Sequence, residues 1–218
     1  TSTNAASLGS GNTLTVGGTG TLGKYILISA SSVTGTFGSS TIPSTYKLLY
    51  TATEVDLIKK AEQSIIAAGS GGGSAPSGRF MTNQSLVGAT LGTITNSSPA
   101  GSSDLSVNLS LTGITVSNLA PATGSTVAAG SSANVTGDFN TGSSTGVKPF
   151  TLSNTDATAI TPTVLSNGNL TIVNNRVVTA TAAAFGVVHL GASMPATTAA
   201  TTLSSPGADT DFTRIRVA

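Results

Sequence analysis

The chain has 218 residues but no cysteine, no tryptophan and a single histidine, and only 8% of its residues are charged. Without cysteine it can form neither a disulfide framework nor a thiolate site. Acid–base and nucleophilic catalysis need several titratable groups held close together. Because His189 stands alone and the eight carboxylates are scattered, we expect a protein that is not an enzyme and that uses no cofactor.

The remaining candidate chemistry lies near the C-terminus. His189 falls in a short strand-like segment between glycines, and no G-x-S-x-G motif supplies a nucleophile for it. Asp209 and Asp211 form an acidic pair of the kind that contributes to Ca²⁺ sites, where about six to eight oxygens surround the ion. The alternative is that Asp209 simply closes a Pro-Gly-Ala-Asp turn. We predict no metal centre, and these two carboxylates are the candidate ligands if calcium binds.

The charge and hydropathy of the sequence predict neither nucleic-acid binding nor a membrane span. The net charge is +1, without a basic cluster, and no apolar run approaches the roughly 20 residues of a membrane span. A cysteine-free chain rich in Ser, Thr, Asn and Gly is typical of a bacterial or archaeal extracellular protein, because small secreted animal domains more often carry disulfides. We expect a secreted or cell-surface protein.

Small hydroxyls, glycine and β-branched residues make up much of the chain, and nearly a third of it is Ser or Thr. Apolar and polar residues alternate in many short runs separated by Gly and Pro, which is the pattern of half-buried strands. The cleanest run is Leu105, Val107, Leu109 and Leu111. We predict an all-β protein with strands near 13–16, 25–28, 46–51, 105–111, 112–117, 132–138, 146–153, 158–165, 169–173, 176–181, 184–190, 197–203 and 211–217.

Residues 53–68 are the one segment in which a helix competes with a strand. The first residues alternate apolar and charged, whereas the later apolar residues lie close to one helical face. We predict a strand to about Leu57 and a short helix from Lys59 to Ala68. The Gly/Ser-rich stretch 69–78 follows and has the composition of a linker. The predicted organisation is a small N-terminal β domain (1–68), a linker (69–78) and an immunoglobulin-like β-sandwich (79–218).

Two local features of the predicted sandwich bear on its topology. Asn167-Gly168 lies between two apolar runs and predicts a tight hairpin turn. Phe212, Ile215 and Val217 form a terminal strand with no turn after it, so we expect an edge that is open to pairing with another chain. An ordinary last strand, paired inside its own sheet, is the alternative.

Two stretches resemble parts of large bacterial surface proteins. Residues 14–57 contain LTVGGTGTLGKYILISASSVTGTFGS and YKLLYTATEVDL, and resemble the C-terminal end of autotransporter-like β-helical regions, where the last coils give way to a capping β segment. Residues 174–217 contain FGVVHLG and resemble the opening of an immunoglobulin-like repeat of the choice-of-anchor D type. Residues 79–173 are similar to a companion sandwich module. The resemblance implies a non-catalytic surface protein whose incomplete modules belong to a longer chain or are completed by a neighbouring subunit.

These observations favour a structural subunit of an extracellular filament or surface layer that assembles with itself by β-strand addition. The predicted donor strand is Thr13, Leu14, Thr15 and Val16. The predicted acceptor is a sheet containing residues 177–179 and 212–217, with Phe212, Ile215 and Val217 at the interface. The alternative function is an adhesin or carbohydrate-binding module that recognises surface glycans. That function would use an exposed aromatic platform or a Ca²⁺ site, and the chain offers only Tyr25, Tyr46 and Tyr50 for the platform.

Overall fold

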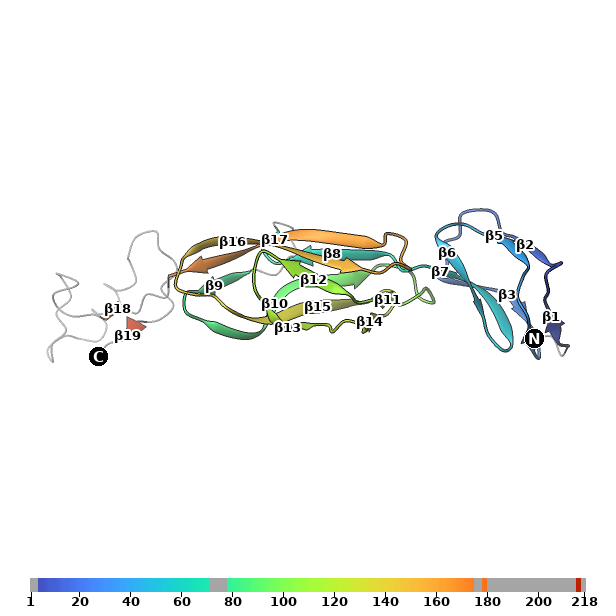
Figure 1. Ribbon diagram of the computed structural model, residues 1–218, viewed down its shortest axis with the longest axis horizontal. Coiled ribbons are helices and arrows are strands. Elements are labelled where there is room, and N and C mark those ends of the chain that lie inside the picture. The colour runs from blue at the N-terminus through green and yellow to red at the C-terminus, as the bar shows by residue number, and fades with distance from the viewer. Residues whose placement is uncertain (1–3, 71–77, 175–177, 180–214, 217–218) are drawn as a thin grey trace, which may run out of the picture.

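The computed structural model describes residues 4–70, 78–174, 178–179 and 215–216, and within them it contains strands and no helix. The prediction of an all-β protein is confirmed. The molecule is elongated (Figure 1), with small N-terminal sheets at one end and a larger two-layered sandwich beside them. No helix of the described residues could cross a membrane.

The N-terminal sheets are built from seven short strands. The first and fourth pair in parallel, as do the second and fifth, whereas the seventh lies between the third and sixth as the antiparallel centre of a three-stranded sheet. The strands are β1 (Ala6–Ser7), β2 (Thr13–Thr15), β3 (Lys24–Ser29), β4 (Val33–Thr34), β5 (Ser39–Thr41), β6 (Tyr46–Tyr50) and β7 (Glu54–Lys59).

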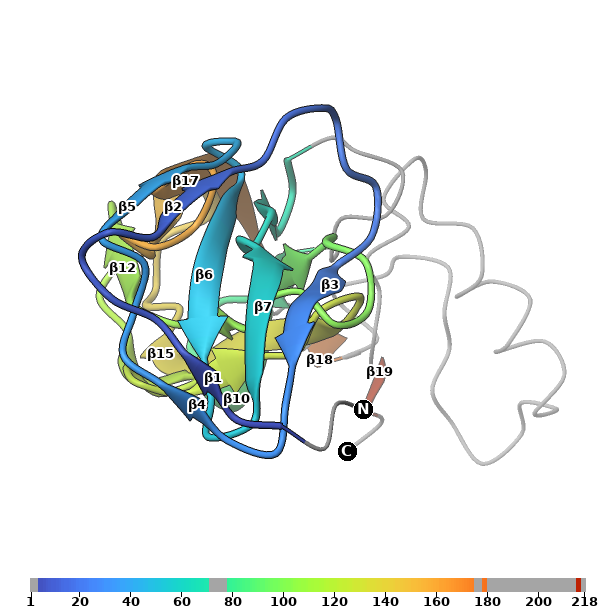
Figure 2. The ribbon, with the colours of Figure 1, turned by 90° about the vertical axis from the view of Figure 1, so that its right-hand side faces the viewer.

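The parallel pairs stack one loop of chain on the next. Ala6 pairs with Val33, and Thr13 pairs with Ser39, so residues 6–15 run alongside residues 33–41. Figure 2 looks onto this end and shows the chain passing through β1, β2 and β3 in one wide turn, then through β4, β5 and β6 in a second. We call these turns the first and second coil. The antiparallel β7 then leads away from the coils.

The sandwich consists of two four-stranded sheets, β13-β15-β10-β8 and β12-β16-β17-β9, with the small β11–β14 pair at one end. A separate parallel pair, β18–β19, follows in sequence. The strands are β8 (Gln63–Ala67), β9 (Arg79–Met81), β10 (Ser85–Asn96), β11 (Leu105–Ser106), β12 (Leu109–Thr112), β13 (Ser117–Ala120), β14 (Thr126–Val127), β15 (Ser132–Asn140), β16 (Gly146–Thr155), β17 (Thr163–Val173), β18 (Val178–Thr179) and β19 (Ile215–Arg216).

A single apolar core fills the space between the two sheets. Leu91, Ile94 and Val135 come from one sheet, and Leu152 and Leu170 from the other; all five are fully buried. Outward positions on the same strands carry mostly Ser, Thr and Asn. The alternation of small apolar and hydroxyl residues therefore places one face of each sheet in the core and the other in solvent.

The predicted helix at 59–68 is wrong, because residues 63–67 form strand β8. Gln63, Ile65 and Ala67 are buried while Ser64 and Ile66 are more exposed, and all five residues pair with β10. The apolar residues of this segment fit both a helix and a strand, and the strand forms because β10 pairs with its main chain along the whole length of β8. As a consequence β8 belongs to the sandwich, and the N-terminal sheets end at Lys59, before the predicted linker at 69–78.

The predicted hairpin at Asn167-Gly168 is also wrong. Residues 163–173 form one continuous strand, and Gly168 pairs with Phe150 on β16. A Cβ on Gly168 would lie 2.5 Å from Cζ of Phe150. The aromatic ring of Phe150 lies directly over the main chain of Gly168 and leaves no room for a side chain. Close approach of another group is one of the reasons for glycine within a strand.

The segment predicted as one strand at 105–111 alternates as expected, but it is divided into β11 and β12, which belong to different sheets. Leu105 and Val107 are fully buried and Leu109 is half-buried, while β11 pairs with β14 and β12 pairs with β16. Main-chain groups at the crossover are bound by the buried Asn154 side chain. Its Oδ1 accepts from Asn108 N at 2.7 Å, and its Nδ2 donates to Ser106 O at 3.1 Å and to Gln63 Oε1 at 2.8 Å.

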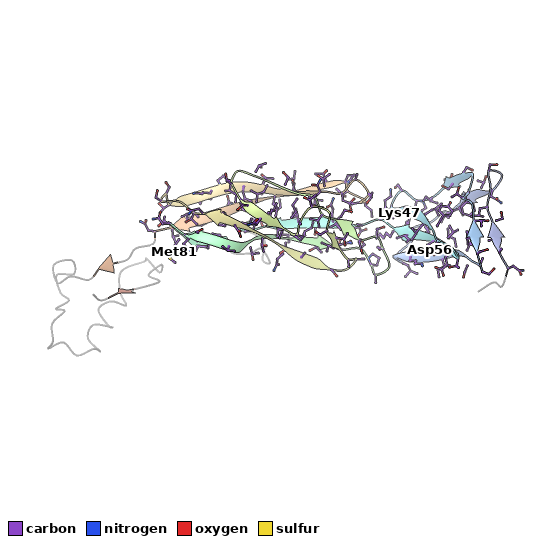
Figure 3. The ribbon with its side chains drawn as sticks, turned by 60° about the horizontal axis from the view of Figure 1, so that its bottom comes forward. Lys47, Asp56 and Met81 are labelled. Atoms are coloured by element: carbon purple, nitrogen blue, oxygen red, sulfur yellow. The ribbon has the colours of Figure 1, made fainter. Side chains whose placement is uncertain are left out.

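The junction between the N-terminal sheets and the sandwich is tight. A Cβ on Gly23 would lie 2.3 Å from the carbonyl oxygen of Ala100, and Ser103 N donates to Lys59 O at 2.9 Å. Lys47 and Asp56 lie on the part of the N-terminal sheets nearest the sandwich, whereas Met81 marks the sandwich's far end (Figure 3).

Asp156 fixes the loop of the sandwich that faces Lys47. Its carboxylate accepts hydrogen bonds from Ser106 N at 2.9 Å, Thr158 N at 2.8 Å and Thr158 Oγ1 at 2.7 Å. Burial raises the pKa of this carboxyl, but the hydrogen bonds from Thr158 and Ser106, together with the positive charge of Lys47, outweigh burial and leave the pKa below its ordinary value.

We expect Leu152→Ala to cost about 2–5 kcal/mol of unfolding free energy, because it opens a cavity between the two sheets. Leu165→Ala, on the neighbouring strand, is the matched control: this side chain is 63% exposed, so its removal should change stability by less than about 0.5 kcal/mol. Urea unfolding followed by far-UV circular dichroism measures both. Equal losses would contradict the assigned faces of the β16–β17 pair.

The Asp156 carboxylate should make stability depend on pH in acid. Because its folded pKa lies below the unfolded one, its contribution is complete above the ordinary value of 3.8 and disappears as pH falls through the folded pKa. Asp156→Asn should therefore be less stable than wild type at pH 7, and the difference should shrink below pH ~3.8. Asp104→Asn, an exposed carboxylate, is the control. A difference that stays constant with pH would exclude this role for Asp156.

Candidate assembly edge at the N-terminal end

The structure places the predicted donor strand inside the protein's own N-terminal sheets. Thr13, Leu14 and Thr15 form β2 and pair in parallel with β5, and Val16 N donates to Thr41 O at 2.9 Å. Leu14 and Val16 are half-buried, while Thr13 and Thr15 are exposed. A strand held in this way is already paired along one side, so its main chain can offer only the other side to a second molecule.

The free side of β2 is defined by the direction of its main-chain groups. Asn12 O and Val16 N point to β5, and in a parallel pair alternate residues point in opposite directions. The N–H and C=O groups of Thr13 and Thr15 therefore point away from β5. In β1, Ala6 N and Leu8 N bond toward β4, so the groups of Ser7 point away from β4 in the same manner.

We call the outward main-chain groups of Ser7, Thr13 and Thr15 the first-coil edge. This edge lies at the extreme end of the molecule, with β1 and β2 outside β4 and β5 (Figures 1 and 2). From residue 1 to residue 46 the sequence has one charged residue, Lys24. Exposed strand edges in natural proteins are usually blunted by charged side chains, proline or bulges, and none of these lies on β1 or β2.

Two tyrosines hold the loop that leads from β2 to β3. Tyr25 Oη accepts from Thr21 N at 3.0 Å and from Leu22 N at 3.1 Å, and Tyr46 Oη donates to Leu22 O at 3.0 Å. The main-chain bonds from Leu22 lower the pKa of Tyr25, whereas burial raises that of Tyr46. The two rings also pack on each other with centroids 6.0 Å apart.

Because of these bonds the tyrosines do not form an exposed aromatic platform. Tyr46 is buried at 3% exposure and Tyr25 is half-buried, and Tyr50 packs against Phe37 with ring centroids 6.3 Å apart. The stacking surface that a carbohydrate-binding module would need is thus absent from these three residues.

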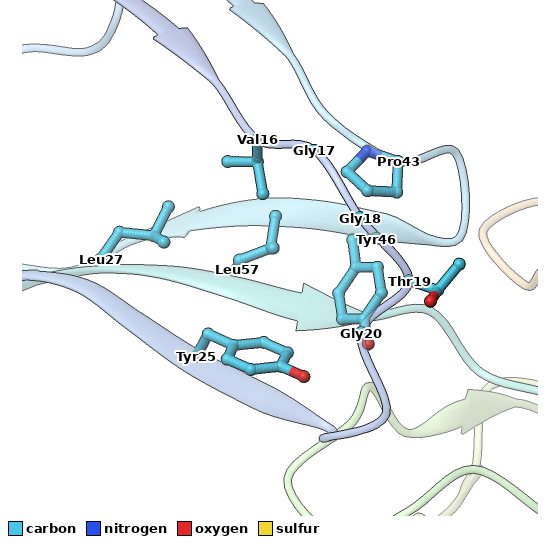
Figure 4. A pocket seen from close by; sticks show the side chains of 10 residues that line it. All are labelled: Val16, Gly17, Gly18, Thr19, Gly20, Tyr25, Leu27, Pro43, Tyr46 and Leu57. Atoms are coloured by element: carbon cyan, nitrogen blue, oxygen red, sulfur yellow. The ribbon is translucent and has the colours of Figure 1, made fainter.

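A pocket of about 240 Å³ lies between the loop 17–20 and the sheet β3-β7-β6. Figure 4 shows Val16, Leu27 and Leu57 on its apolar side and the rings of Tyr25 and Tyr46 next to the glycine-rich loop. The tyrosine hydroxyls are already bonded to the loop, so the pocket is an incompletely filled interior of the coils rather than a polar binding site.

One ion cluster fixes the start of β3 on the central strand β7. Lys24 Nζ lies 3.0 Å from Glu54 Oε2 and 2.9 Å from Asp56 Oδ2, and the Asp56 carboxylate is buried. Bonds to Asp56 and Glu54 raise the pKa of Lys24. Among the described residues Lys24 is the cation paired with the Asp56 carboxylate, which accepts no other hydrogen bond there, so this cation holds β3 against β7.

Several predicted site residues lie outside the described residues: His189, Asp209, Asp211, Phe212 and Val217. Ile215 is in β19, which pairs in parallel with β18. Of the acceptor residues predicted at the interface only Ile215 is described, and its recorded pairing is with β18, not with Thr13–Val16. Within the part of the chain that is described, no group of three or more His, Asp or Glu residues could hold a metal ion.

Sequence reasoning identified β2 but missed the importance of its neighbours. The signal that could have found the first-coil edge is the near absence of charge before residue 47, since uncharged strands have no protection against edge pairing. The parallel pairing that leaves this edge open carries no local sequence signal.

Comparison of the chain with protein-family models, with curated protein sequences and with solved structures finds no match.

Proposed function

We propose that the protein is a structural subunit of an extracellular filament or surface layer, and that subunits join by adding a strand to the first-coil edge. The observation that carries the proposal is the uncharged, outward-pointing main chain of Ser7, Thr13 and Thr15 at one end of an elongated molecule. The extracellular setting is supported by the cysteine-free, Ser/Thr-rich composition.

The role of β2 in this proposal differs from that of a donated strand. Since β2 is bonded to β5 on one side, it acts as the acceptor, and the incoming strand comes from a second copy of the chain. The incoming strand would continue the stack that β2 and β5 begin, with main-chain hydrogen bonds supplying the affinity. A matching donor by sequence is the alternating stretch 211–217, which contains β19.

The positions of the two partners favour growth in one direction. The first coil lies at one end of the molecule, and β18 and β19 lie beyond the opposite end of the sandwich (Figure 1). A contact between different surfaces at opposite ends is heterologous, and it produces an open fibre unless a rotation closes it into a ring.

The double variant Thr13→Pro, Thr15→Pro tests the edge. Proline removes the N–H and puts ring carbons in its place, and both N–H groups point away from β5, so the subunit should still fold. We expect wild type to form larger assemblies as concentration rises and the double variant to remain a monomer, measured by analytical ultracentrifugation and electron microscopy.

Ser40→Pro is the matched control, because Ser40 lies on β5 and its main chain points away from β2 on the inner side. It should assemble as wild type does. Circular dichroism must show the same strand content for all three proteins. Assembly of the double variant at wild-type concentrations, or a wild type that stays monomeric, would refute strand addition at this edge.

A further inference from the structure

We propose that the sandwich is a tension-bearing unit, built so that a pull along the long axis of the molecule loads its strands in shear. The proposal concerns the single folded chain and does not depend on how subunits join. It follows from where the chain enters and leaves the sandwich and from the direction of the two strands at those points.

The chain enters the sandwich through β8 at the junction with the N-terminal sheets. Lys59, the last residue of β7, is bonded at the junction to Ser103, and β8 runs from Gln63 at this end to Ala67 toward the other end. All five β8 residues pair with β10, whose last residue Asn96 lies beside Gln63. A pull on the N-terminal sheets therefore acts along β8, from its first residue.

The chain leaves the sandwich through β17 at the opposite end. This strand runs from Thr163 near the junction to Val173, next to β9 and Met81 (Figures 1 and 3). It pairs with β16 over ten residues and with β9 over three. A pull on the segment that follows Val173 therefore acts along β17, from its last residue and in the direction opposite to the pull on β8.

β8 and β17 are parallel neighbours, although they belong to different sheets. Ile160 N donates to Ala61 O at 2.9 Å and Gln63 Nε2 to Thr161 O at 2.6 Å. Farther along, Ala67 N donates to Ser166 Oγ at 3.1 Å. The bonds advance in the same direction on both strands, so the two pulled strands are joined directly to each other.

The last bond of this series lies at the far end of β8. Asn169 N donates to Ala68 O at 2.8 Å, and Ala68 N donates to Leu91 O at the same distance. Ala68 thus joins β17 to β10, and both sheets resist the displacement of this point.

Side-chain packing also holds β8 in place. Ala61, Ile65, Ala67 and Ala68 are buried in the core between the sheets. At the entrance, Glu62 N donates to Ser98 Oγ at 2.8 Å and Ser97 N to Glu62 O at 2.8 Å. To slide by one residue, β8 must withdraw these side chains and break its five pairs with β10 together.

The loading geometry decides how these bonds fail. When strands are pulled along their length from opposite ends, every pair shares the load and the ladder breaks in one step. When two strands are pulled apart from the same end, the pairs break one after another. Forced unfolding is governed by the rate of crossing the unfolding barrier, so the first geometry should resist a much higher force.

Single-molecule stretching of the full chain tests the proposal, with cysteine handles that are unique because the natural chain has none. Lys60→Cys with Asn174→Cys pulls β8 and β17 from opposite ends. Lys60→Cys with Ala157→Cys pulls two points at the junction end and separates the strands from one side. We expect a several-fold higher rupture force for the first pair. Equal forces, or a weaker first pair, would overturn the proposal.

Two variants in the first pulling geometry locate the resistance. Ser166→Ala removes the hydroxyl that accepts from Ala67 N, so the rupture force should fall. Ser153→Ala removes a hydroxyl on the outer face of β16 and should leave the force unchanged. Similar forces for both variants would contradict the direct bond between the two pulled strands. Because the readout is one molecule at a time, failure here is distinguishable from failure of the assembly edge.

Discussion

The structure depends on strand β8, which belongs to the sheet of β10 and is also bonded to the β17 side of the other sheet. Its main chain pairs with β10, while Gln63, Ala67 and Ala68 make bonds to the β17 side. Two stacked sheets are otherwise held together only by side-chain packing between their inner faces. Since β8 follows β7 after three residues, the same strand also fixes the N-terminal sheets to the end of the sandwich. Two parts of unequal size are thereby joined without a flexible connection.

Buried amides complete the main-chain bonding that the short strands leave open. The Asn154 side chain bonds main-chain groups of the segment between β11 and β12. Asn96 donates to Ser103 O and Val127 O at 3.1 Å each beside the junction. An unbonded buried main-chain group would cost about 1–3 kcal/mol. These buried amides therefore satisfy main-chain groups that the apolar core around them cannot bond.

Local alternation was sufficient to predict the all-β class and several strands, since Leu105 to Leu111, β15 and β16 all follow the period of two. It failed where a longer-range partner decides the outcome. β8 was assigned to a helix because its apolar residues fit both periods, and Gly168 was assigned to a turn because Phe150 cannot be seen from sequence. The longest strand, β10, was missed because Gly88 and Gly92 interrupt its pattern and are accommodated by bulges opposite β15. For the assembly edge, the residues of β2 could be named from sequence, but its pairing with β5 could not.

The edges of the sandwich and of the coils differ in how they are protected against pairing with another strand. β8 is covered by β17, β9 carries Arg79, and β13 pairs with β15 through an irregular register next to Asp138. Charges and bulges of this kind discourage edge-to-edge pairing. The coils have neither on β1, β2, β4 or β5, and the outer coil faces away from the rest of the molecule. The sandwich edge strand β12 lacks these features too, so what distinguishes β1 and β2 is their place at the end of the molecule, where the proposed pairing with a second copy would extend the same stack.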